Sequence, residues 1–192
     1  MKRITLTICL ISVLYFSGNS QTMDSAAMMK AWQAFMTPGD MQKMLAKSDG
    51  VWDAEVTTWM DPSKPPQKSK STCTNKMVLN GLYQESVHKG TMMGMPFEGH
   101  GTVGYDNAKK VFVSSWIDNM GSGIMYAEGN WDNASKSVIM KGKSTDPLTG
   151  KDTGVKEVIK FFDDNTQIME MYGTGPDGKE MKWMEIKFTR KK

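Results

Sequence analysis

The chain has 192 residues, of which 39% are hydrophobic and 23% charged, and a formal net charge of +3. That length suits one domain with its own hydrophobic core. Lysine and arginine are concentrated nowhere beyond the terminal Arg190-Lys191-Lys192. The composition therefore argues against a nucleic-acid partner, which normally requires a dense basic patch.

Residues 1–20 have the features of a secretory signal peptide. Lys2-Arg3 is followed by an apolar run over residues 4–16 and by the small residues 18–20, the order in which a signal peptide presents its regions. The apolar run is well short of the roughly 20 residues needed to cross a bilayer. We therefore predict cleavage after Ser20 and an exported protein, periplasmic or secreted, whose mature chain has no transmembrane anchor.

Removal of this segment would leave 22 basic against 21 acidic residues and a single cysteine, Cys73. One cysteine cannot form an intramolecular disulfide, so the mature chain must be stabilised by its core. An isolated cysteine at a strand position is most often a small buried hydrophobic residue. The oligomeric state does not follow from the sequence.

Residues 21–48 are predicted to be a helical segment. Apolar residues recur there at the spacing of a single helix face, namely Met28, Ala31, Trp32 and Phe35. The sequence Thr37-Pro38-Gly39-Asp40 then interrupts the pattern and is typical of the start of a second helix. We expect one or two short helices, placed to cover one end of the domain that follows.

Residues 49–192 change to a period of two, which is typical of strands. Turn sequences such as Asn80-Gly81 and Asp106-Asn107 separate the strand-like segments. Short links make neighbouring strands antiparallel, and closure of the sheet removes exposed edges. We therefore predict an all-β domain, an antiparallel meander β-barrel of about ten strands. The predicted strands are residues 51–60, 69–79, 82–89, 97–105, 110–118, 123–128, 137–143, 155–162, 166–172 and 182–189.

The hairpin over residues 94–118 is the most distinctive part of this pattern. Its first strand contains Gly99, Gly101 and Gly104. Glycine weakens a strand interior and is expected where the strand bends sharply or where a neighbouring group comes close. We predict that a side chain added at these glycines destabilises the fold, so that Gly101→Val lowers the thermal midpoint by several degrees.

Several motifs in and around this hairpin also occur in a known family. They are Gly50-Val-Trp52, the pattern Gly-x-Pro-Phe-Glu-Gly-x-Gly-x-x-Gly-Tyr-Asp over residues 94–106, Trp116-Ile-Asp118 and Met169-Glu170-Met171-Tyr172. With these motifs, residues 44–190 resemble the bacterial family known as domain of unknown function 1579. The resemblance implies a calycin-like cup, similar to lipocalins and fatty-acid-binding proteins. It implies no catalytic residues and no cofactor, because the family has no established activity.

The function that we predict is the binding of a small hydrophobic or amphipathic ligand inside the barrel. A barrel of about ten strands is wide enough that side chains need not fill it. Which face of each strand points inward stays open, since a one-residue slip exchanges the two faces. The candidate pocket residues are Trp52, Phe97, His100, Tyr105, Trp116, Asp118 and Tyr126.

Two alternative functions remain open, and a copper site is considered beside them. The protein could be a hydrolase or isomerase that uses Asp118 or His100 in the barrel mouth. It could be a cell-envelope interaction module with a filled barrel and an apolar outer patch. The methionines of residues 92–95 could hold Cu(I) with His88 or His100, but the other methionines are scattered where they can fill core volume. The predicted site therefore contains no metal and no cofactor.

Overall fold

The computed structural model describes residues 24–61, 63–175 and 177–192, and the predicted signal peptide lies outside them. The described residues form two helices, α1 (Ser25–Met36) and α2 (Asp40–Ala46), a 3-10 turn η1 (Leu79–Gly81) and ten strands. The strands are β1 (Gly50–Thr58), β2 (Gln67–Val78), β3 (Tyr83–Met92), β4 (Met95–Asp106), β5 (Val111–Asp118), β6 (Met125–Asp132), β7 (Ser137–Thr145), β8 (Asp152–Asp163), β9 (Thr166–Thr174) and β10 (Glu180–Arg190).

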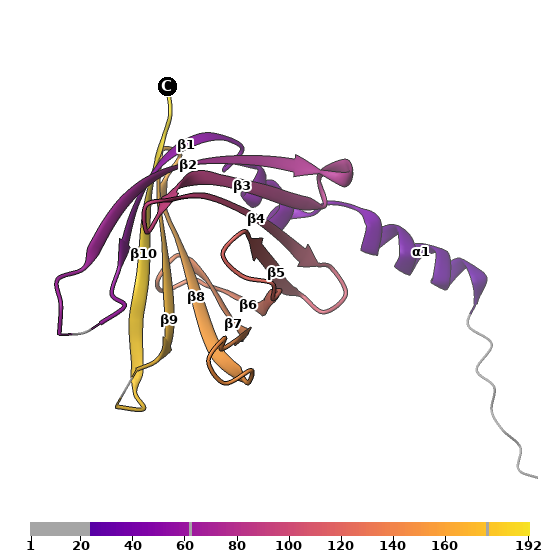
Figure 1. The fold of residues 1–192 in the computed structure, drawn as a ribbon. Coiled ribbons are helices and arrows are strands. Elements are labelled where there is room, and N and C mark those ends of the chain that lie inside the picture. Colours follow the sequence, from indigo (N-terminus) through magenta and orange to yellow (C-terminus); the bar gives the residue numbers. More distant parts are fainter. Residues whose placement is uncertain (1–23, 62, 176) are drawn as a thin grey trace, which may run out of the picture.

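The ten strands form one closed antiparallel barrel (Figure 1). Each strand pairs with the next in the chain, and β1 pairs with β10 to close the sheet, with Val56 opposite Ile186. Closure leaves neither β1 nor β10 with an unpaired edge. The predicted ten-strand meander barrel, preceded by short helices, is thus confirmed.

Side chains alternate between the interior and the outer surface along each strand. In β1, Trp52, Ala54 and Val56 are buried, whereas Asp53 and Glu55 between them are exposed. The registers extend this alternation around the barrel. The buried residues form two separate clusters, one centred on β1, β2 and β10, and the other on α2 and β5 to β7. Close packing inside the barrel is therefore concentrated in two regions of the wall.

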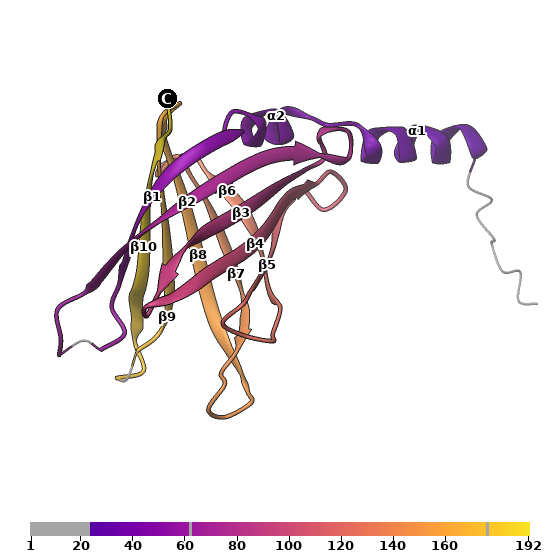
Figure 2. The ribbon, with the colours of Figure 1, turned by 45° about the horizontal axis from the view of Figure 1, so that its top comes forward.

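Helix α2 covers one end of the barrel (Figure 2). The Gln42 amide donates to the carbonyl oxygen of Tyr105 at 3.0 Å, and the Gln84 amide donates to that of Leu45 at 2.7 Å. Where the chain leaves α2, the indole of Trp52 donates to the carbonyl oxygen of Ser48 at 2.9 Å. The bond to Leu45 satisfies a carbonyl in the last turn of the helix, and the three bonds together fix α2 and the chain that leaves it over the barrel. The opposite end carries the longer connections, such as residues 59–66 and 146–151.

Helix α1 extends away from the barrel and has no buried residue (Figures 1 and 2). The Asn107 side chain bonds the C-terminal end of α1 to the barrel by donating to the carbonyl oxygens of Ala34, Phe35 and the C-cap Thr37. Phe35 and Met36 also line a pocket with Tyr83 and Tyr105. Of the two helices, α2 alone caps the barrel. No helix among the described residues has the length and hydropathy to cross a membrane.

Candidate ligand-binding site

The inner wall of the barrel carries acidic but almost no basic side chains. From the registers and burial of the described strands, the carboxylates that face inward are those of Asp118 and Glu157. Of the lysines and arginines on the described strands, only Arg190 lies on the inward-facing side of its strand. Its guanidinium lies 4.2 Å over the Trp52 ring at the covered end and donates to backbone carbonyls there. The rest of the interior therefore has no fixed positive charge.

Glu157 lies on β8 inside the barrel and is 9% exposed. The Ser114 hydroxyl of β5 donates to its Oε2 at 3.3 Å. Since β6 and β7 stand between β5 and β8 in the sheet, this bond crosses the interior. Burial raises the pKa of Glu157 to about 7, although the bond from Ser114 acts in the opposite direction. This carboxyl group therefore changes protonation near neutral pH.

His88 and Cys73 form a second polar pair in the interior. They are opposite one another on β3 and β2, with His88 Nε2 3.3 Å from Cys73 Sγ. Burial raises the pKa of Cys73 to about 12 and lowers that of His88 to about 4. Both groups are therefore neutral near pH 7. A nucleophilic cysteine requires the opposite shifts, towards thiolate and imidazolium.

Trp116 lies beside His88 and shares the inward face of β5 with Ser114. Its ring centroid is 5.1 Å from that of His88, and it stacks at 6.5 Å on Phe97. The indole nitrogen donates to Asp118 Oδ2 at 2.7 Å, and the other carboxylate oxygen of Asp118 accepts from the backbone of Met120. Asp118 thus orients the indole and the following turn.

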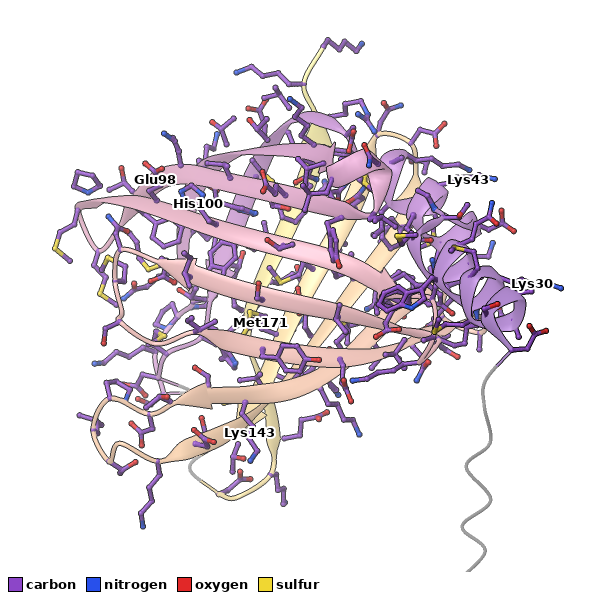
Figure 3. All side chains as sticks on the ribbon, turned by 90° about the vertical axis from the view of Figure 1, so that its right-hand side faces the viewer. Lys30, Lys43, Glu98, His100, Lys143 and Met171 are labelled. Carbon is purple, nitrogen blue, oxygen red and sulfur yellow. The ribbon has the colours of Figure 1, made fainter. Side chains whose placement is uncertain are left out.

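The structure divides the candidate pocket residues between the two faces of the wall. Five face inward, namely Trp52, Phe97, Tyr105, Trp116 and Asp118. His100 faces outward with a side chain that is 50% exposed, and its Nε2 lies 2.9 Å from Glu98 Oε1 (Figure 3). Tyr126 is 49% exposed and donates to Glu128 on the outer surface. A ligand inside the barrel would contact neither His100 nor Tyr126.

Sequence reasoning missed Glu157, Ser114 and Cys73 as site residues and considered His88 only as a copper ligand. Glu157 had a detectable signal, because it stands between Val155 and Ile159 on the same side of the predicted strand. An acidic residue between two inward-facing apolar positions indicates either a buried carboxyl group or an error in the assigned face. Ser114 and Cys73 carried no comparable signal.

Solvent reaches part of the interior. Several inward-facing side chains keep an intermediate exposure, namely Ser86, Phe97, Trp116, Met125, Ile159, Met169 and Met184. In a fully packed core such side chains would have no exposed surface. Methionines are frequent on this face, and their unbranched thioethers adapt to ligands of irregular shape. The partly exposed face is thus suited to an apolar molecule.

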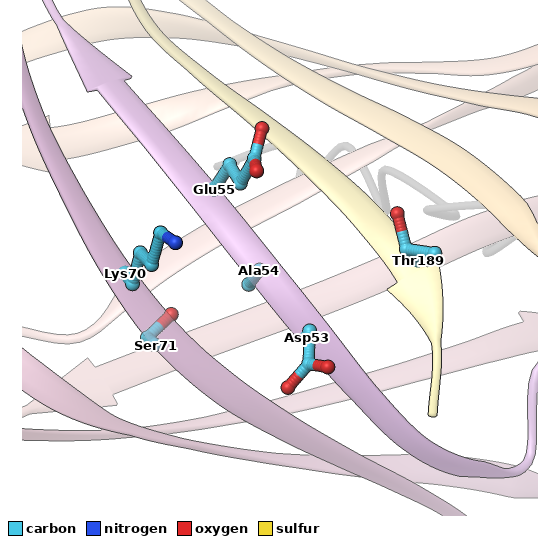
Figure 4. Close-up of a pocket in the computed structure, with 6 residues that line it drawn as sticks. All are labelled: Asp53, Ala54, Glu55, Lys70, Ser71 and Thr189. Carbon is cyan, nitrogen blue, oxygen red and sulfur yellow. The ribbon is translucent and has the colours of Figure 1, made fainter. Parts of the chain in front are cut away.

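A shallow groove also crosses the outer surface of β1, β2 and β10 (Figure 4). Its lining is mostly polar and consists of Asp53, Ala54 and Glu55 from β1, Lys70 and Ser71 from β2 and Thr189 from β10. Glu55 and Lys70 are cross-strand neighbours of opposite charge. Across the described part of the chain, no three His, Cys, Asp or Glu side chains are grouped closely enough to hold a metal ion. The groove therefore has the features of a solvated outer face.

A closed ten-strand barrel with a capping helix and a partly accessible interior places the protein among calycin-like β-barrels. The model of a family described as "Protein of unknown function (DUF1579)" matches residues 37–190, and the chain belongs to that family. Helix α1 precedes the matched region. None of the curated proteins compared with the chain matches it.

The solved structures that are similar to the chain include a natural protein and a redesigned barrel. The crystal structure of Rv2717c from M. tuberculosis has a TM-score of 0.61 and 9% identity, covering 81% of this chain and all of that one. A redesigned β-barrel, b11L5F_LGL, has a TM-score of 0.40 and 15% identity, covering 77% of this chain and 95% of that one. At this identity the similarity to Rv2717c supports the barrel fold alone.

Proposed function

We propose that the protein is exported and binds a small hydrophobic or amphipathic molecule inside its barrel without converting it. The observation that carries the proposal is the partial exposure of Trp116, Phe97 and inward-facing methionines such as Met125, Met169 and Met184. Exposed apolar surface in a concave wall is the usual feature of a small-molecule site. A few polar groups, here Ser114 and Glu157, would orient the ligand.

Enzymatic activity receives less support than binding. Of the two residues considered for it, His100 lies on the outer surface, and both carboxylate oxygens of Asp118 already accept hydrogen bonds. The buried His88 and Cys73 are both neutral near pH 7. Binding without conversion accounts for the interior with fewer assumptions.

The binding proposal is tested with the neutral fluorescent probe N-phenyl-1-naphthylamine. Binding inside the barrel should raise its fluorescence, and Trp116→Ala should weaken that binding at least tenfold. The matched control is Trp32→Ala, because Trp32 is 55% exposed on α1 and lies outside the barrel wall. Equal loss in both variants, or no saturable binding together with no co-purifying molecule in native mass spectrometry, would overturn the proposal.

Export has its own test. The intact mass of protein recovered from outside the cytoplasm should correspond to a chain that begins at Gln21. A product that retains Lys2 and Arg3 and fractionates with the cytoplasm would contradict export and would leave the binding proposal unaffected.

A further inference from the structure

The inner wall is selective by charge as well as by hydrophobicity. Below the covered end, its ionisable acids are Glu157 and Asp118, and Asp118 is already bonded to Trp116 and Met120. All strand lysines in the described residues lie on the outward parity, where many pair with acids such as Glu98 and Glu170. A ligand inside the barrel would therefore meet carboxyl groups without compensating ammonium or guanidinium groups.

One oxygen of Glu157 is free to accept a ligand. Ser114 bonds Oε2, and no other hydrogen-bond partner of this carboxyl group occurs in the described chain. Every fully buried side-chain nitrogen or oxygen in the described residues has a partner. Oε1, which has none, must therefore be reached by solvent. It is the one carboxylate oxygen of the inner wall that is both accessible and unpaired.

The surroundings of Glu157 are apolar. Its cross-strand neighbours are Met140 on β7 and Met171 on β9, both buried. Because few polar groups and little water surround this carboxyl group, a charge close to it interacts with it more strongly than in bulk water. A second carboxylate near Glu157 would be repelled and desolvated without a partner, whereas an ammonium group would gain a charge-assisted hydrogen bond.

We infer that the interior selects apolar molecules that end in an amine and discriminates against carboxylates of the same shape. This inference rests on the proposed function and names its ligand class. Oε1 of Glu157 accepts from the ammonium group, Ser114 holds the other oxygen, and the apolar chain runs along the methionines towards the open end. From Glu157 to the end of β8 at Asp152 the strand rises roughly 17 Å, which accommodates a chain of about twelve carbons.

Three probes with the same chain isolate the charge of the end group: dodecylamine, dodecanol and dodecanoate. Each competes with N-phenyl-1-naphthylamine at pH 8, below its micelle concentration. The parent should bind dodecylamine at least tenfold more tightly than dodecanoate, a difference of about 1.4 kcal/mol, with dodecanol between them. Equal affinities for the amine and the carboxylate would overturn the inference and leave the proposed function standing. Saturable binding of N-phenyl-1-naphthylamine that none of the three probes displaces would also overturn the inference, whereas no saturable binding of that dye together with no co-purifying molecule would overturn the proposed function itself.

Glu157→Gln tests the residue assignment, since the amide keeps the size of the side chain and removes the charge. We expect the preference for dodecylamine over dodecanoate to fall to less than threefold. The control, Glu128→Gln, removes an acid from the outer surface, where Glu128 accepts from Tyr126, and should keep the preference of the parent. A preference that persists in a folded Glu157→Gln variant would refute the role of Glu157. If that variant does not fold, the parent's preference among the three probes still decides the inference.

Discussion

The indole of Trp116 lies directly against the backbone of Gly99. A Cβ atom built on Gly99 would come 2.2 Å from Cζ2 of that ring, and one on Gly101 would come 3.2 Å from its Cε3. Gly104 lies on the opposite, outward-facing side of β4, and a Cβ atom built on it would come 2.6 Å from the ring of Tyr83. None of the three has a positive φ. These glycines are therefore explained by the close approach of aromatic rings, which was one of the two reasons expected from the sequence.

Gly99→Ala should displace Trp116 and destabilise the barrel. The ring cannot move freely, because Asp118 holds its nitrogen and His88 and Phe97 lie beside it. Inserting a methyl group into such a contact typically costs about 1–3 kcal/mol, so the thermal midpoint should fall by several degrees, at roughly 2–4 °C per kcal/mol. Gly101→Ala is the control and should cost less. Equal midpoints for Gly99→Ala and the parent would show that the ring relocates without cost.

The strands of the barrel wall could be predicted from the sequence, whereas the residues that line the candidate ligand-binding site could be predicted only in part. The alternation and turns along residues 49–192 were enough to predict the strands, because they depend on neighbours in the chain. The sequence did not show which side of β4 faces inward. Phe97 and His100 lie on opposite sides of this strand, and the residues on either side could plausibly line the interior. The contact of Ser114 with Glu157 joins strands that are not neighbours in the sheet. No local sequence pattern encodes such a contact. It becomes visible only once the strands have closed into a barrel.

Gly142→Ala should be more damaging than Gly99→Ala. A Cβ on Gly142 would come 1.9 Å from the carbonyl oxygen of Tyr126, which is backbone and cannot turn aside. The methyl group would force β6 and β7 apart and break their hydrogen bonds. We expect a severe loss of soluble protein or a thermal midpoint below that of Gly99→Ala. Gly154→Ala is the matched control on β8, because a Cβ there meets nothing within 4 Å. Similar midpoints for Gly142→Ala and Gly154→Ala would contradict the prediction.

Glu157 should make the unliganded protein less stable as the pH rises. Burial raises its pKa from 4.5 to about 7, so the folded protein holds this proton more tightly than the unfolded chain. Its contribution to stability is complete below about pH 4.5 and is lost as the pH rises through 7. From pH 5 to pH 8 this group should lower the free energy of unfolding by on the order of 2 kcal/mol.

Urea denaturation of the parent and of Glu157→Gln at pH 5, 6.5 and 8 measures this effect. The variant should gain stability relative to the parent as the pH rises, because the amide does not ionise. Glu128→Gln on the outer surface should follow the parent. If the stability difference between Glu157→Gln and the parent is independent of pH, the carboxyl group does not titrate as its burial requires.

His88 should make the protein less stable as the pH falls towards 4. Burial lowers its pKa from 6.5 to about 4. Between these two values the unfolded chain binds a proton at His88, whereas the folded protein does not. The stability that depends on neutral His88 is present above pH 6.5 and is lost as the pH falls through 4. The groups that contact it are the Cys73 thiol and the rings of Trp116 and Phe188, and none of these is a carboxylate that would hold the charged form.

His88→Gln tests this effect through the slope of stability against pH, because loss of the ring also costs packing at every pH. Between pH 7 and pH 4 the parent should lose on the order of 2–3 kcal/mol more than the variant in urea denaturation. Trp32→Ala is the control, since Trp32 is exposed on α1 and its replacement removes no titratable group, and the pH dependence of this variant should match that of the parent. Parallel pH profiles for His88→Gln and the parent would mean that the folded barrel accepts a proton at His88, and the neutral pair with Cys73 would then have to be abandoned.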